Sequence, residues 1–146
     1  MPTVQLNTEI EIAATPELVW NVLTDFDSYP QWNPLITSIW GPLQVGSRLV
    51  LAVSQPGGRE MRWRPTVTHV ERTHELRWLG RFLFRGLFDG EQFFKLRGLE
   101  DGRTRLIHGE TFSGLLAERF AHRMPSTARG FAVMNQALKR RAERLS

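Results

Sequence analysis

Residues 4–12 alternate in the type of side chain that they carry. Polar side chains stand at every second position, and the positions between them are apolar except for Thr8. A period of two is that of a half-buried β-strand. A helix should follow directly, because Thr15-Pro16-Glu17 supplies a hydroxyl N-cap, a proline at the first helical position and an acid in the first turn. Residues 26–34 contain closely spaced prolines and leave room for only a short further turn of helix.

Between residues 35 and 112 the pattern predicts consecutive strands joined by short connections. The breaks include Gly41-Pro42, Pro56-Gly57-Gly58 and Asp101-Gly102, and such short turns favour antiparallel hairpins. The predicted strands are 35–40, 46–54, 59–71, 75–81, 88–98 and 103–112. A long helix is predicted after Pro125, with Ser126 or Thr127 as its cap. Its apolar stripe consists of Phe131, Met134, Leu138, Ala142 and Leu145.

This order of elements predicts a single α+β domain over residues 1–146. The chain length is close to the commonest size for one domain. We expect a curved, seven-stranded antiparallel sheet wrapped around a long C-terminal helix, with two short helices after the first strand. One helix cannot fill the concave side of such a sheet. A cavity between the sheet and the helix is therefore the expected place for function.

Composition and charge narrow the class of protein. Hydrophobic residues make up 41% and charged residues 23%, which is typical of a folded globular chain. The net charge is +4, but the densest basic run, Lys139 to Arg144, ends the predicted helix, where cations are favoured by the helix dipole. No nucleic-acid partner is therefore expected. With no cysteine, no long apolar segment and no signal-type segment, we expect a cytoplasmic protein without stable membrane insertion.

Two ionisable residues share the inward face of the strand predicted at 103–112. Alternation places His108 and Glu110 on the same side as Leu106 and Phe112. A glutamate on an apolar face needs a partner or a solvated cavity. His108 and Glu110 are therefore candidates for a general acid/base pair, and the alternative is a polar pair with a structural role only.

Further polar and aromatic side chains are predicted to face the same cavity. Gln92 could orient a carbonyl or hydroxyl group of a ligand or be a satisfied buried amide, and Asn135 lies beside the apolar stripe of the last helix. Trp63 and Trp78 offer flat faces to an aromatic ligand or belong to the core. The residues expected to contact a ligand are Trp32, Met61, Trp63, Trp78, Phe84, Gln92, Phe94, His108, Glu110, Phe112, Phe131 and Asn135. No metal site and no cofactor are expected, because no metal-ligand spacing, phosphate loop or dinucleotide motif is present.

The connection at 82–88 is unusually apolar for a link between two strands. It reads Phe-Leu-Phe-Arg-Gly-Leu-Phe, where a polar turn would be expected. Four interpretations are open: a lid over the cavity, a contact in a homodimer, packing into the core, or a foot on a membrane surface. The first two are favoured.

Four segments of the chain, taken in order, resemble one known family. They are Thr15-Pro16-Glu17-Leu18-Val19-Trp20, Tyr29-Pro30-Gln31-Trp32-Asn33-Pro34, the strand carrying His108, Glu110, Phe112 and Gly114, and the helix from Gly130-Phe131 to Leu138-Lys139. They are similar to the START-like (SRPBCC) superfamily, in its polyketide cyclase/dehydrase-like bacterial branch. The resemblance implies a helix-grip fold, as in Bet v 1 and START domains, with a hydrophobic ligand tunnel. Many relatives have histidine at the position of Gln92, and this departure from the family pattern weakens an acid/base role for Gln92.

The fold serves lipid carriers, hormone receptors, aromatase/cyclases and chaperone co-activators alike, so it does not by itself define the activity. The favoured hypothesis is binding of a small hydrophobic ligand, lipid-like or aromatic, without catalysis. The alternatives are a polyketide cyclase, aromatase or dehydratase that uses His108 and Glu110, and a protein-interaction regulator.

Overall fold

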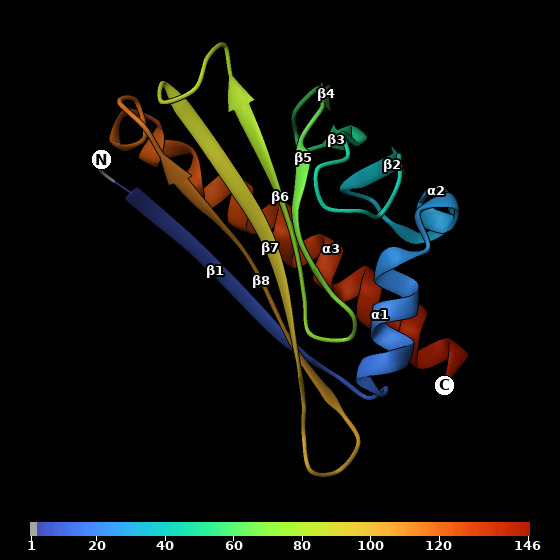
Figure 1. Cartoon of the computed structure of the whole chain (residues 1–146). Helices are drawn as coiled ribbons and strands as arrows, with labels where there is room; N and C mark the ends of the chain where they lie inside the picture. The colour runs from blue at the N-terminus through green and yellow to red at the C-terminus, as the bar shows by residue number, and fades with distance from the viewer. Residues whose placement is uncertain (1–2) are drawn as a thin grey trace.

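The computed structural model describes residues 3–146 and shows an α+β protein (Figure 1). Antiparallel strands form two sheets, and the longest helix ends the chain. The elements in order are β1 (Thr3–Ile12), α1 (Pro16–Thr24), the 3-10 turn η1 (Phe26–Ser28), α2 (Tyr29–Trp32), β2 (Ile36–Trp40), β3 (Val50–Ser54), β4 (Glu60–Trp63), β5 (Thr66–Glu71), β6 (Glu75–Phe82), β7 (Phe88–Gly98), β8 (Thr104–Ser113), the 3-10 helix η2 (Glu118–Arg123) and α3 (Met124–Leu145).

The strands form a five-stranded sheet of order β1-β8-β7-β6-β5 and a three-stranded sheet of order β2-β3-β4. The prediction of one continuous strand at 59–71 is wrong, because this segment divides at Arg64-Pro65 into β4 and β5. Proline has no N–H for a sheet ladder, and the Pro65 carbonyl instead accepts a hydrogen bond from the Leu49 amide at 2.8 Å. An isolated bridge between Arg48 and Thr66 links the two sheets at this point. The predicted α+β arrangement is confirmed, but the described strands form two sheets where a single seven-stranded sheet was predicted.

The two main helices begin differently. Thr15 caps α1 as predicted, and its Oγ1 accepts a hydrogen bond from the Leu18 amide at 3.2 Å. The last helix begins at Met124, so the prediction of Ser126 or Thr127 as its cap is wrong. Pro125 stands in the first turn of α3, where a missing N–H costs no helical hydrogen bond. The prediction failed because η2 leads into α3 without a break.

The core lies between the five-stranded sheet and α3, which crosses behind this sheet in the view of Figure 1. Phe131, Met134, Leu138 and Ala142 are buried on one stripe of α3, as the spacing predicts, whereas Leu145 is exposed. At the C-terminal end of α3, buried side chains of α1 complete the packing. The two layers are therefore in close contact at this end of the sheet.

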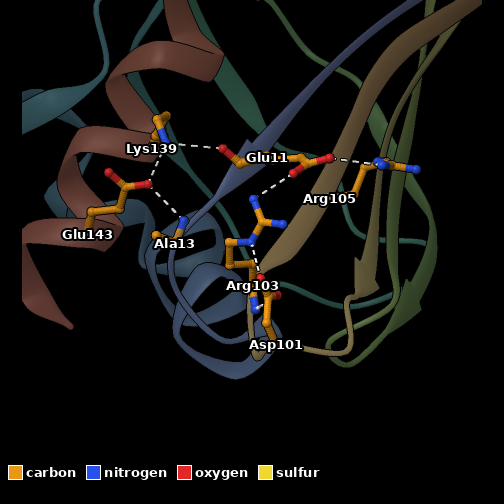
Figure 2. Close-up of polar contacts among 7 residues, drawn as sticks. All are labelled: Glu11, Ala13, Asp101, Arg103, Arg105, Lys139 and Glu143. Carbon is orange, nitrogen blue, oxygen red and sulfur yellow. Dashed lines mark hydrogen bonds and ion pairs between the residues drawn. The ribbon is translucent and has the colours of Figure 1, made fainter.

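Polar contacts fasten the same end (Figure 2). Lys139 Nζ donates to the Glu11 backbone oxygen at 3.2 Å, and the Glu143 carboxylate accepts from the Ala13 amide at 2.7 Å. Glu11 in turn pairs with Arg103 at 2.7 Å and with Arg105 at 2.9 Å. These contacts join α3, β1 and β8, so the sheet and helix are closed here. Among residues 3–146, space between the sheet and the helix remains toward the N-terminal half of α3.

Candidate functional site

A cavity of about 660 Å³ occupies this space. It lies between β3 and β4 on one side, the inward face of β6, β7 and β8 on another, and η2 with the first turns of α3. Most of its wall is apolar, and its volume is within the roughly 300–1,000 Å³ typical of small-molecule sites. The polar side chains on its wall are Gln55, Arg81, Gln92, Glu110, Arg123, Ser126 and Thr127.

Two glycines leave one side of the cavity without side chains. Gly80 on β6 and Gly90 on β7 are paired across the sheet, and both line the cavity. A β-carbon at Gly90 would collide with a carboxylate oxygen of Glu110. At Gly80 the nearest atom to an added β-carbon is the Gly90 oxygen, 4.0 Å away. Gly90 therefore provides the room for the Glu110 carboxyl, and Gly80 leaves a hollow beside it.

Glu110 is the only carboxyl group on the cavity wall among the described residues, 3–146. Within the same part of the chain no hydrogen bond or ion pair reaches it, and burial alone raises its pKa from 4.5 to about 8. At neutral pH the group is therefore mostly protonated. A protonated carboxyl can donate one hydrogen bond and accept others, so Glu110 is free to form hydrogen bonds to a ligand in this cavity.

His108 lies two residues earlier on β8 but does not line the cavity. Its ring is fully buried between those of Phe94 and Phe131, with centroid distances of 4.3 Å and 3.9 Å. Its Nδ1 is 2.8 Å from Asn135 Oδ1, and its Nε2 is 2.7 Å from Gln92 Nε2. An amide oxygen only accepts and an amide nitrogen only donates. His108 is thus held as the neutral tautomer with its proton on Nδ1.

The chain of hydrogen bonds continues on both sides of the imidazole. Trp78 Nε1 donates to Gln92 Oε1 at 3.0 Å, and Asn135 Nδ2 donates to Thr8 Oγ1 at 2.9 Å. The Thr8 hydroxyl then donates to the His108 backbone oxygen at 2.6 Å. Burial lowers the pKa of His108 to about 3, against a smaller opposite effect of the Asn135 hydrogen bond. This network holds β1, β6, β7, β8 and α3 together around one neutral histidine.

The structure separates the predicted ligand contacts into three groups. Those on the cavity wall are Met61, Trp63, Trp78, Gln92, Glu110, Phe112 and Phe131. Phe94, His108 and Asn135 are buried beside the cavity in the network just described. Trp32 lies on α2, with its ring 5.1 Å from that of Tyr29, and Phe84 is 60% exposed in the β6–β7 loop. His108 and Glu110 share a face of β8, as predicted, but no hydrogen bond joins them.

Other residues on the cavity wall were not predicted from the sequence. Phe120 and Arg123 belong to η2, a segment for which the pattern predicted no element. Gly80 and Gly90 stand at inward positions of two predicted strands, where a glycine leaves space that another residue would fill. That signal was present in the sequence and could have located the open side of the cavity. No described helix is both long enough and apolar enough to span a membrane.

Comparisons with known proteins agree with this geometry. The family model described as polyketide cyclase / dehydrase and lipid transport matches residues 3–144. A START superfamily protein from Mycobacterium smegmatis superimposes with a TM-score of 0.78 at 22% identity, covering 97% of this chain and 99% of that one. The Zhui aromatase/cyclase from Streptomyces sp. R1128 gives 0.78 at 17% identity, with 98% and 95% covered.

A norcoclaurine synthase from Thalictrum flavum, in complex with dopamine and hydroxybenzaldehyde, gives a TM-score of 0.74 at 13% identity, with 99% and 89% covered. No curated protein sequence matches the chain. At these identities the solved structures show a shared fold and not a shared activity. The match of the family model covers nearly all of the sequence, and the chain, which has a START-like fold, therefore belongs to the polyketide cyclase / dehydrase and lipid transport family.

Proposed function

We propose that this protein binds a small, mainly apolar molecule in the cavity between its sheets and α3, with one polar group of that molecule facing Glu110. The observation that carries the proposal is the partly buried carboxyl of Glu110, which has no partner within residues 3–146 and faces a mostly apolar cavity of about 660 Å³. A buried polar group without a hydrogen bond costs stability. A ligand that supplies the missing partner removes this cost, and the molecule as a whole gains from burial of its apolar surface.

The cavity wall supports a more specific description of the ligand. The indole rings of Trp63 and Trp78 and the rings of Phe112 and Phe131 suit a flat aromatic or a lipid-like molecule. Because the Glu110 carboxyl is mostly protonated at neutral pH, it can donate a hydrogen bond to a carbonyl or hydroxyl oxygen. Both polar atoms of the Gln92 amide already form hydrogen bonds, to Trp78 and to His108, so Gln92 contributes mainly to the shape of the cavity wall. We place this binding in the cytoplasm, since the chain has no cysteine.

Filling the hollow at Gly80 should weaken binding strongly. In Gly80→Phe the new ring would occupy the cavity, and its β-carbon would meet no atom closer than 4.0 Å. We expect the fluorescence of the neutral apolar probe N-phenyl-1-naphthylamine to rise with the natural protein. With the variant the apparent affinity should fall by about tenfold or more, the effect of losing about 1.4 kcal/mol of binding free energy.

The matched control is Gly58→Phe, which places the same side chain in the exposed turn between β3 and β4. It should bind the probe like the natural protein. Equal probe affinity for Gly80→Phe and Gly58→Phe, with both variants folded, would show that the cavity is not the binding site. Native mass spectrometry of the protein as purified would then be the direct search for a bound molecule and for the number of subunits.

A second function, acid–base catalysis of the cyclase or dehydratase type, is favoured by one observation only. Glu110 has a raised pKa of about 8 and faces the cavity, as a proton-transferring group requires. The same geometry does not support His108 as its partner, because both ring nitrogens are occupied. If a molecule recovered from the cavity is also converted, Glu110→Gln should slow turnover roughly 10²–10⁴-fold with little change in binding. Unchanged turnover would leave binding as the function.

A further inference from the structure

Large apolar side chains are exposed at one end of the molecule, on two neighbouring loops. Leu83 is 78% exposed, Phe84 60% and Leu115 71%, and Phe82 at the end of β6 is also exposed. We call these four residues the apolar tip. Single exposed apolar residues are common on protein surfaces, but a group of them points to a contact surface.

Backbone hydrogen bonds join the two loops of the apolar tip. The Leu115 amide donates to the Gly86 oxygen at 3.0 Å, and the Leu116 amide donates to the Leu87 oxygen at 2.9 Å. In Figure 1 the β6–β7 loop and the connection after β8 lie toward the same end of the molecule. The exposed side chains therefore belong to one surface rather than to two independent loops.

The backbone of Leu83 has an unfavourable conformation for a leucine. Leu83 has a φ of 65°, in the left-handed region where glycine and asparagine are favoured. A leucine there is strained, and its side chain gains little from burial because it is mostly exposed. Strain of this kind is concentrated at functional positions. Asparagine at position 83 would tolerate this backbone conformation better and would remove the exposed apolar side chain.

Arginines surround the apolar tip. Arg81 lies near the end of β6 and Arg85 in the β6–β7 loop, and Arg119 and Arg123 follow Leu115 in η2; all four are exposed. The acidic residues of the same two segments are Asp89, which lies 3.9 Å from Arg81, and Glu118. The surface therefore combines exposed apolar side chains with a net positive charge. This combination suits the interface of an anionic bilayer, which takes up apolar side chains and attracts nearby cations.

We propose that the apolar tip docks reversibly on the surface of an anionic lipid bilayer, with its apolar side chains in the interfacial region and its arginines on the lipid headgroups. The tip also adjoins the cavity, whose wall includes Arg81, Phe82 and Arg123. Docking therefore brings the cavity to the membrane surface, where apolar molecules are concentrated. It depends only on the apolar tip and its arginines, so it can hold or fail independently of the proposed ligand binding.

The experiment is cosedimentation with vesicles of phosphatidylcholine alone and of phosphatidylcholine containing one third phosphatidylglycerol. We expect the natural protein to bind the anionic vesicles and to bind the neutral ones much more weakly. The double variant Leu83→Asn with Phe84→Ser should lower the partition coefficient by about tenfold or more, since it removes two exposed apolar side chains. The double variant Arg85→Gln with Arg119→Gln, which leaves the cavity wall intact, should lower it by a similar factor.

Trp40→Ser is the matched control, because Trp40 is 63% exposed but lies at the end of β2 in the other sheet. It should bind the anionic vesicles like the natural protein. The Leu83→Asn change should also raise the midpoint of thermal unfolding, which separates lost docking from lost folding. No binding by the natural protein, or equal binding by the Leu83 and Phe84 variant, overturns the proposal. A dimer in sedimentation equilibrium that the same variant abolishes also overturns it, since the apolar tip would then bind a second copy.

Discussion

Replacing Glu110 with glutamine should stabilise the protein at neutral pH. In the unfolded chain the carboxyl loses its proton near pH 4.5, whereas in the native state it keeps the proton up to about pH 8. Between these values unfolding releases a proton, so the stability of the natural protein falls as the pH rises. Glutamine has a similar size and no titration. The stability advantage of Glu110→Gln should therefore grow by up to about 2.5 kcal/mol between pH 5 and pH 7.

Urea unfolding of both proteins at the two pH values measures this difference directly. The titration of His108 is common to both proteins and cancels in the comparison. Glu118→Gln is the control, because it removes an exposed carboxylate from η2 and should give the same small difference at both pH values. A constant difference between Glu110→Gln and the natural protein would mean that the Glu110 carboxyl is already ionised at pH 5 in the native state.

Replacing Asn135 with leucine should destabilise the protein by about 1–3 kcal/mol, the cost of leaving a buried donor without a partner. Asn135 Oδ1 accepts a hydrogen bond from His108 Nδ1, and Asn135 Nδ2 donates one to Thr8 Oγ1. Both Asn135 and His108 are buried. Leucine has nearly the same volume but offers no acceptor. The imidazole would keep its stacking between Phe94 and Phe131 while one nitrogen lost its hydrogen bond.

Gln136→Leu makes the same change of chemistry on the exposed face of α3 and should alter stability by less than about 0.5 kcal/mol. Nitrogen-15 NMR of the imidazole supplies a second measurement. The natural protein should show His108 neutral and protonated on Nδ1 from pH 5 to pH 8, because burial lowers its pKa to about 3. A His108 that gains a proton near pH 6.5, or a stable Asn135→Leu variant, would contradict the hydrogen-bond network.

Much of the architecture could be predicted from local patterns. Alternation identified β1 and β8 and placed His108 and Glu110 on one face, because side chains on a strand change sides at every residue. The start of α1 was predicted from Thr15-Pro16-Glu17, since the capping interaction involves neighbouring residues only. The division at Pro65 and the start of α3 at Met124 were missed. The division involves the bridge between Arg48 and Thr66, which are far apart in the chain. The start of α3 depends on η2, which leads into it without a break.

The sequence by itself determined which side chains point inward, because this follows from the period of each strand and helix. Only the tertiary structure decided which of them meet solvent in the cavity and which meet protein. His108 and Glu110 are two residues apart on the same face of β8. The aromatic ring of Phe131 covers His108, whereas the paired glycines Gly80 and Gly90 leave Glu110 open to the cavity. Those contacts join elements far apart in the chain, so no local sequence pattern contains them. They are the reason that His108 is a buried neutral histidine while the Glu110 carboxyl is available to a ligand.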